Sequence, residues 1–205
     1  MFPSLIFVTL LFLATTALPV RDRRYALYKY KWKKCTLTFR FHDPYGLFNN
    51  EADYQTARQT IIDAIRIWER ASNQRLKFID ASAVKMRDQV DLKTRPNIDI
   101  SFAKGAHGCE ESLDGPGGIV AHSAYLPHGL VHFDAQENWN VDGLDNSGPD
   151  LRYVALHELG HVLGIKHSNN NDSVMSPFYR DRRQRDFGLS FDDIGAIQQL
   201  YSHCK

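Results

Sequence analysis

The sequence feature that most constrains this chain is an eleven-residue segment, HELGHVLGIKH, that begins at His157. Residues four positions apart lie on one face of an α-helix, so His157 and His161 can direct ring nitrogens to the same point. Glu158 is carried beside them. Gly164 lets the backbone turn sharply after the helix, which allows His167 to return to that point. The segment therefore predicts three imidazoles around one metal ion.

Three protein ligands leave the fourth tetrahedral position of a zinc ion open, which distinguishes a catalytic zinc from a closed structural one. Glu158 is then suited to act as the general base of a hydrolytic reaction. The alternative is that these histidines simply lie on the exposed face of an amphipathic helix. The added glycine and third histidine favour the zinc site.

Hydrophobic periodicity predicts an α+β domain whose C-terminal part is helical. The expected strands cover residues 35–42, 76–80 and 97–103, with two shorter apolar runs at 119–125 and 130–133. The expected helices cover residues 51–72, 150–163 and 191–201. Asn50 is an expected N-cap, and Ser190 with Asp193 has the spacing of a capping box.

Composition narrows the class of protein further. The 205 residues suit one domain, and a hydrophobic content of 43% is typical of a globular chain. The formal charge of +1 gives no bulk electrostatic reason to bind nucleic acid. We therefore expect no nucleic-acid partner.

The N-terminus predicts secretion. An apolar run at residues 5–13 precedes the small residues Thr15 and Ala17, which is typical of a signal peptide spanning residues 1–17. The run is too short to cross a membrane. Residues 21–24 read RDRR and resemble a convertase site, so residues 18–24 would be a short propeptide. The alternative is a solvated run of charges.

Secretion places the cysteines in an oxidising compartment, where disulfides form. The chain has three, Cys35, Cys109 and Cys204. An odd number implies that one of them differs in role from the other two.

The extended motif resembles that of the metzincins, in which HExxHxxGxxH is followed by a Met-turn. Met175 lies eight residues after His167 and fits that turn, and Ser168 is the residue that matrixins show after the third histidine. Other matrixin-like segments occur in the same order: YAL at residue 25, KW at 31, AHG at 106, DGPGG at 114, HFD at 132 and SFDDIGAIQQLY at 190. The chain thus resembles a matrix metalloproteinase catalytic domain over residues 25–205. The resemblance implies the metzincin fold, a twisted mixed five-stranded sheet with three helices.

The resemblance also implies a second, structural zinc. Its ligands would be His107, Cys109, His122 and His132, with the cysteine where the family has aspartate. A thiolate is a good zinc ligand, so we expect a closed four-ligand site. That assignment leaves Cys35 and Cys204 free to form a disulfide. In the alternative, Cys109 enters a disulfide, and the site keeps three histidines with water or stays empty.

At least one calcium ion is implied as well, because carboxylates around a glycine turn suit calcium. The corresponding positions are the side chains of Asp114, Asp134 and Glu137 and the carbonyls of Gly115, Gly117 and Ile119. The alternative is that these are exposed acidic loop residues. A second calcium site is expected to be missing, because the loop before His132 lacks a GGD run.

By this resemblance we expect a secreted, extracellular zinc-dependent endopeptidase that hydrolyses peptide bonds through a zinc-bound water, with Glu158 as general base. An extended substrate peptide would pair with the strand at residues 119–125. The expected substrate-binding residues are Val120, Ala121, Pro177 and Tyr179. Expected partners are extracellular proteins or peptides and metalloproteinase inhibitors. We expect a monomer that does not bind membranes.

Two departures from the resemblance, Cys109 and the lack of a recognisable pro-domain, support an alternative function. Neither a pro-domain with a zinc-capping cysteine nor a hemopexin-like domain can be recognised in the sequence. We therefore expect any latency to use other means. The alternative function is a catalytically weak, matrixin-like module that binds inhibitors or matrix proteins.

Overall fold

The computed structural model describes residues 25–86, 88, 93–141, 148–178 and 188–205. The expected signal peptide, residues 1–17, and propeptide, residues 18–24, lie outside the described residues. Within the described ranges, no helix is both long enough and apolar enough to cross a membrane.

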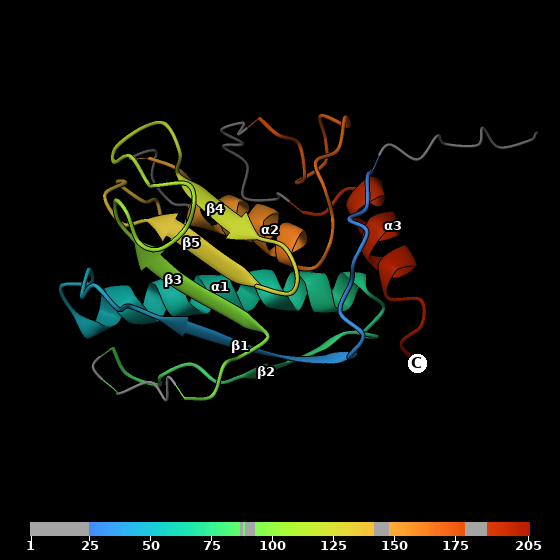
Figure 1. The fold of residues 1–205 in the computed structure, drawn as a ribbon, viewed down its shortest axis with the longest axis horizontal. Coiled ribbons are helices and arrows are strands. Elements are labelled where there is room, and N and C mark those ends of the chain that lie inside the picture. The colour runs from blue at the N-terminus through green and yellow to red at the C-terminus, as the bar shows by residue number, and fades with distance from the viewer. Residues whose placement is uncertain (1–24, 87, 89–92, 142–147, 179–187) are drawn as a thin grey trace, which may run out of the picture.

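One mixed sheet of five strands forms the centre of the domain (Figure 1). Its strands, in chain order, are β1 Thr36–His42, β2 Lys77–Asp80, β3 Ile98–Ala103, β4 Ala121–Ala124 and β5 Leu130–Asp134. The spatial order is β2-β1-β3-β5-β4, and only β4 runs antiparallel to its neighbour. Because β4 is an edge strand, backbone groups on its outer side are free to pair with another chain.

Three helices in the described ranges complete the fold: α1 Glu51–Ala71, α2 Leu151–Val162 and α3 Phe191–Leu200. The Asn50 side chain accepts from the Asp53 amide at 2.9 Å, as expected of an N-cap. The Ser190–Asp193 capping box is present at the start of α3. The predicted α+β fold with five strands and three helices is confirmed, with element ends within two residues of the expected ones.

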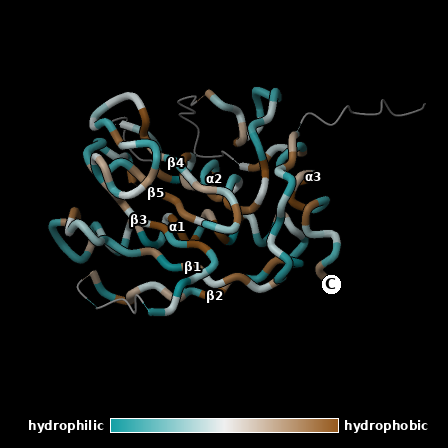
Figure 2. Tube along the Cα trace, in the orientation of Figure 1, coloured by the Kyte–Doolittle hydropathy of each residue, from teal (hydrophilic) through white to brown (hydrophobic). Residues whose placement is uncertain are grey.

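The main core lies between the sheet and the helices. Leu37, Phe39 and Phe41 alternate along β1, are at most 4% exposed, and pack in one cluster with α1. The Trp68 indole N–H donates to the Leu156 carbonyl at 3.0 Å and so joins α1 to α2. Figure 2 shows hydrophobic stretches along the central strands and the helices behind them. The core thus fixes α2 relative to the sheet edge at β4.

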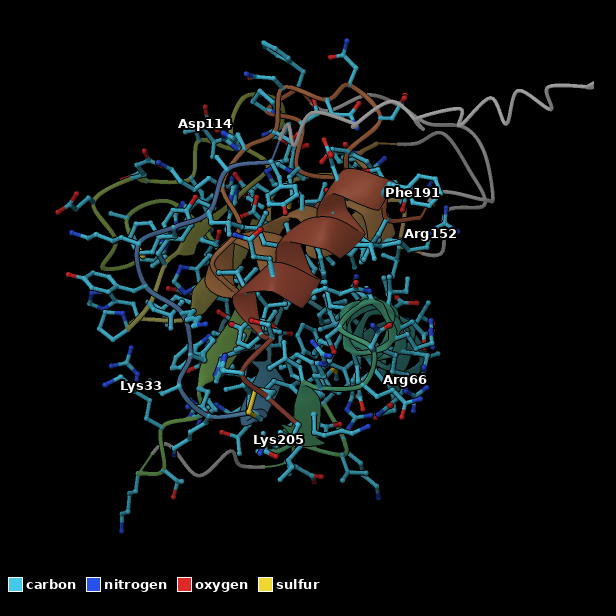
Figure 3. All side chains as sticks on the ribbon, turned by 90° about the vertical axis from the view of Figure 1, so that its right-hand side faces the viewer. Lys33, Arg66, Asp114, Arg152, Phe191 and Lys205 are labelled. Carbon is cyan, nitrogen blue, oxygen red and sulfur yellow. A yellow bond between two sulfur atoms is a disulfide. The ribbon has the colours of Figure 1, made fainter. Side chains whose placement is uncertain are left out.

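A disulfide joins Cys35, just before β1, to Cys204, just after α3, with a Cα–Cα distance of 5.6 Å. Figure 3 shows its yellow bond close to Lys205. Cys109 is a free cysteine, so the alternative in which it enters this disulfide does not occur in the structure.

Candidate active site and metal centres

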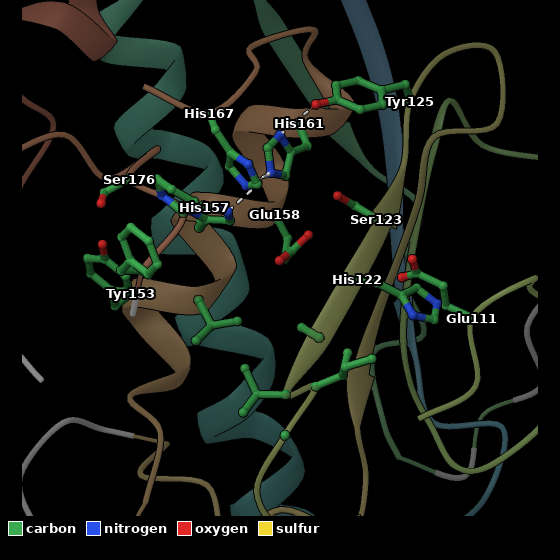
Figure 4. Close-up of a pocket in the computed structure, with 17 residues that line it drawn as sticks. Glu111, His122, Ser123, Tyr125, Tyr153, His157, Glu158, His161, His167 and Ser176 are labelled. Carbon is green, nitrogen blue, oxygen red and sulfur yellow. Dashed lines mark hydrogen bonds between the residues drawn. The ribbon is translucent and has the colours of Figure 1, made fainter. Parts of the chain in front are cut away.

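The two helical histidines of α2 and the histidine that follows its C-terminus meet at one point. The His161 Nε2 atom lies 3.1 Å from His157 Nε2 and 3.2 Å from His167 Nε2. The helix ends because Gly164 adopts a φ of +100°, a left-handed conformation that suits glycine. This turn returns the chain so that the third ring faces the first two (Figure 4).

Hydrogen bonds to carbonyl groups orient the helical histidines. The Nδ1 atom of His157 is 2.7 Å from the Val174 carbonyl, and that of His161 is 2.8 Å from the Ile165 carbonyl. Each Nδ1 therefore carries the hydrogen, and each Nε2 presents a lone pair to the common point. Burial, with His157 adding a smaller effect, lowers the pKa of His161 to about 3, which keeps its ring neutral.

This arrangement fits a zinc ion. Tetrahedral zinc with Zn–N bonds of about 2.0–2.1 Å spaces its ligand nitrogens about 3.3 Å apart. The observed spacings of 3.1 and 3.2 Å lie close to that value. Lone pairs that converge so closely repel one another unless a cation lies between them. The donor set therefore suits a divalent cation with an open position.

Met175 packs against Gly160 of α2, and the fold requires a glycine there to admit it. A Cβ atom on Gly160 would come within 2.3 Å of the Met175 sulfur and 3.1 Å of the Trp68 ring. Met175 itself is 0% exposed. Asp193 holds this turn from α3, because its carboxylate accepts from the Ser173 hydroxyl and, at 3.0 Å, from the Val174 amide.

The histidines and Glu158 open into a cleft of about 570 Å³ between α2 and the edge strand β4. Burial raises the pKa of Glu158 to about 7, and the Ser123 hydroxyl opposes this rise. Val120, Ala121 and Pro177, which the resemblance implied would bind substrate, line the cleft. Tyr179, the remaining residue predicted to bind substrate, lies outside the described residues.

Several residues of the cleft were not predicted from the sequence. Ser123 faces Glu158 from β4 (Figure 4). Its buried hydroxyl has no hydrogen-bond partner of standard geometry among the described residues. The hydroxyl of Tyr125, at the end of the same wall, lies 3.1 Å from His161 Nδ1. Single serine and tyrosine residues carry no spacing pattern, so only the fold could reveal their proximity to α2.

A second cluster gathers the four residues that the resemblance implied for the structural zinc. His122 and His132 lie directly opposite each other on β4 and β5, with 3.3 Å between His122 Nε2 and His132 Nδ1. His107 Nε2 lies 3.1 Å from His122 Nε2, and the Cys109 sulfur lies 3.4 Å from His132 Nδ1.

These distances fit a closed tetrahedral site. A Zn–S bond of about 2.3 Å with a Zn–N bond of about 2.0–2.1 Å separates sulfur from nitrogen by about 3.5 Å. Burial lowers the pKa of His132 to about 4, and His107 and His122 lower it further, so the ring stays neutral. Burial raises the pKa of the Cys109 thiol, an effect that a coordinated cation would reverse.

The expected calcium ligands fold around one turn, but their carboxylates contact backbone amides. Asp114 accepts from Ile119 at 3.0 Å, and Glu137 accepts from Gly117 at 2.7 Å. Asp134, which is 0% exposed, accepts from the amides of Gly115 and Gln136. Among the described residues, these three carboxylates do not form one of the compact clusters that the zinc ligands form. They attach the loop before β4 to the end of β5.

The fold and the three-histidine site beside a buried glutamate define a metallopeptidase of the metzincin type. Comparison with known proteins gives the family. The matrixin family matches residues 31–202, and the chain therefore belongs to the matrixin family of metalloendopeptidases.

Three relatives illustrate the similarity. Matrix metalloproteinase-15 of Homo sapiens is 35% identical over 88% of this chain and 26% of its own length. Stromelysin-3 of Mus musculus is 38% identical over 88% of this chain and 33% of its own length. Matrix metalloproteinase-2 of Drosophila melanogaster is 37% identical over 89% of this chain and 22% of its own length. The chain thus spans a third or less of these relatives.

Proposed function

We propose that the chain is a secreted endopeptidase that hydrolyses peptide bonds in extracellular proteins, with zinc held by His157, His161 and His167. The single observation that carries this proposal is the convergence of three neutral imidazole nitrogens beside the Glu158 carboxylate in an open cleft. Zinc held there would lower the pKa of a coordinated water and polarise a substrate carbonyl.

Glu158 is the proposed general base. Its side chain is carried by the same helix as two ligands and faces the cleft, so it can take a proton from an attacking water and return it to the leaving amine. Burial favours a carboxyl group that exchanges a proton near neutral pH, since the pKa of Glu158 is raised to about 7. The alternative function, a catalytically weak binding module, does not require this arrangement.

Substrate binding is proposed at the edge of the sheet. An extended peptide can add to the free edge of β4 through backbone hydrogen bonds. Ile119 and Phe178 line the cleft and are 38% and 70% exposed, so they offer apolar surface to a substrate side chain. These features support proteins that offer extended segments with apolar side chains as the substrates. They also support inhibitors that bind in the same cleft as partners.

Two further metal sites are proposed. Cys109 and the three histidines around it would hold a second, structural zinc. The loop containing Asp114 would bind at least one calcium ion, and a rise in melting temperature on adding calcium would support that site. Cleavage after residues 1–17 and after Arg24 is proposed from the sequence.

One experiment tests the proposed activity. The zinc-loaded chain should cleave a quenched peptide with a central Gly–Leu bond, and a zinc chelator should abolish the cleavage. Glu158→Gln should keep both zinc ions, measured by elemental analysis, and lower kcat/KM by roughly 10²- to 10⁴-fold. Retained turnover in this variant would refute the general-base role, whereas an inactive native chain would favour the binding-module alternative.

A further inference from the structure

We propose that Tyr125 is a positioning residue for His161, and that the N-terminal strap, defined as residues 26–28, holds Tyr125 and the His161 ring in place. This inference rests on the proposed zinc site. It assigns a role to two tyrosines and to a segment far from α2 in the sequence.

Two acceptors share the hydrogen on His161 Nδ1. The Ile165 carbonyl lies 2.8 Å from this nitrogen, and the Tyr125 hydroxyl oxygen lies 3.1 Å from it (Figure 4). Since Nε2 presents its lone pair to the ligand cluster, Nδ1 carries the hydrogen and both oxygens can accept from it. Two acceptors restrict rotation of the ring more than one acceptor does. His161 is only 8% exposed, so water cannot easily replace either acceptor.

The Tyr125 ring is itself held by the strap. The rings of Tyr28 and Tyr125 stack with centroids 4.4 Å apart and an interplanar angle of 15°. Such a stack stabilises the two rings beyond the effect of the apolar area that they bury.

The strap also holds the second acceptor. Leu27 and Ile165 form an antiparallel bridge. On either side of it, the Tyr28 amide donates to the Gly164 carbonyl at 2.8 Å and the Lys166 amide donates to the Ala26 carbonyl at 2.8 Å. Both acceptors of the His161 N–H are therefore fixed by the same three residues of the strap. Displacement of the strap would loosen both together.

Loss of the Tyr125 hydroxyl is expected to lower zinc affinity more directly than it affects peptide hydrolysis. Removing a group that orients a metal-binding histidine typically weakens metal affinity by 10- to 100-fold. Tyr125→Phe removes one of two acceptors and keeps the ring, so we expect the lower end of that range, roughly tenfold. Tyr28→Phe keeps the stacked ring and serves as the matched control. Tyr28→Ala removes the stack and should weaken zinc binding in the same direction.

Zinc affinity of the full chain would be measured by competition with a chelator. Cobalt substitution separates the two centres, because only the centre with Cys109 gives a thiolate charge-transfer band. We expect Tyr125→Phe to weaken zinc binding at the three-histidine centre roughly tenfold and leave the cysteine-containing centre unchanged, with Tyr28→Phe within twofold of the native chain. The double variant Tyr28→Ala/Tyr125→Phe should bind zinc only slightly less tightly than the single variant with the lower zinc affinity. Both changes act through the same contact between Tyr125 and His161, so their effects should not add.

Three other results would each overturn one part of the proposal. A native chain that binds zinc tightly and a Tyr125→Phe variant within twofold of it would overturn the role of Tyr125. Additive effects of Tyr28→Ala and Tyr125→Phe would overturn the role of the strap. A native chain that binds no zinc at the three histidines would instead overturn the proposed catalytic site.

Discussion

At the scale of single residues, the replacement of an aspartate by Cys109 is the departure from the matrixin pattern that the structure makes most informative. The sequence showed an odd cysteine without showing its partner. In the fold its sulfur lies 3.4 Å from His132 Nδ1, and it is not in a disulfide. A thiol beside three imidazoles is well suited to binding a metal, because thiolate and neutral imidazole are both good zinc ligands.

Cys109→Ala should therefore lose the second zinc and keep the first. The expected zinc content falls from two ions per chain to about one, and the melting temperature falls because the loop around His107 loses its attachment. Elemental analysis and calorimetry check both. Cys109→Asp restores the usual family ligand and should keep two ions. Unchanged zinc content and unchanged stability in Cys109→Ala would exclude the cysteine as a ligand.

A buried charge cluster on the sheet gives a second prediction at this scale. Arg40 and Asp99 are cross-strand neighbours on β1 and β3, joined at 2.6 Å, and His42 lies 3.0 Å from the same carboxylate. Burial alone would raise the pKa of Asp99, but hydrogen bonds from His42 and Arg40 outweigh it and lower the pKa to about 2.

The lowered pKa makes stability depend on pH in a defined direction. The charged carboxylate stabilises the fold above its unfolded pKa of about 3.9, and this contribution is lost as the pH falls towards 2. Asp99→Asn should cost roughly 2–3 kcal/mol at pH 7, because the buried Arg40 loses the charge-assisted hydrogen bonds that the Asp99 carboxylate accepts. Urea unfolding at pH 7 and pH 3 checks this. The difference between native and variant chains should shrink at pH 3, and a constant difference would contradict the assignment.

At the scale of elements, β4 lies between the second cluster of possible metal ligands and the cleft. Side chains alternate along a strand, so His122 points to the second cluster while Ser123 points to Glu158. The strand is short, and its antiparallel register with β5 places His122 opposite His132. The sequence predicted an apolar run here but not this division of its two faces. A shift of His122 in the second cluster is therefore expected to move Ser123 in the cleft as well.

The disulfide acts on elements rather than on the site. It joins the start of β1 to the residues after α3 across 169 positions of sequence. Closing so long a loop restricts the unfolded chain, so replacing both Cys35 and Cys204 by alanine should cost roughly 2–5 kcal/mol. Zinc content should stay unchanged, since no proposed ligand is affected. Urea unfolding and elemental analysis check the two expectations, and a loss of zinc in the folded variant would show that the disulfide also shapes the metal centres.

At the scale of the whole molecule, the N-terminal segment packs against the C-terminal helix. The Tyr25 hydroxyl donates to the Gln199 side chain at 2.8 Å, and the ring of Tyr25 covers Gly195 of α3. Asp192 lies one helical turn before Gly195, and one of its carboxylate oxygens is buried without a hydrogen-bond partner among the described residues. Asp193, by contrast, is occupied with Ser173 and Val174.

Cleavage after Arg24 should therefore create a new ion pair. The freed ammonium group of Tyr25 is expected to pair with Asp192, so the chain that starts at Tyr25 should be more stable than the chain that keeps residues 18–24. A partly buried pair of this kind is worth about 1–3 kcal/mol. Calorimetry on both forms measures the gain, and Asp192→Asn should remove it. If cleavage after Arg24 stabilises Asp192→Asn as much as the native chain, the ammonium group pairs with another residue.

The sequence by itself determined the class of fold, the helix that carries His157 and His161, and the chemistry of the three-histidine motif. It could do so because helical periodicity and ligand spacing are local properties of the chain. The membership of Cys109 in a metal cluster was implied only through a resemblance.

Only the tertiary structure decided how distant segments meet. It placed Ser123 opposite Glu158, the Tyr125 hydroxyl at His161 and the strap across the turn that follows α2. It also showed that the carboxylates expected to bind calcium accept hydrogen bonds from backbone amides. These contacts depend on strand register and on packing between the sheet edge and α2, which join residues far apart in sequence and leave no local pattern.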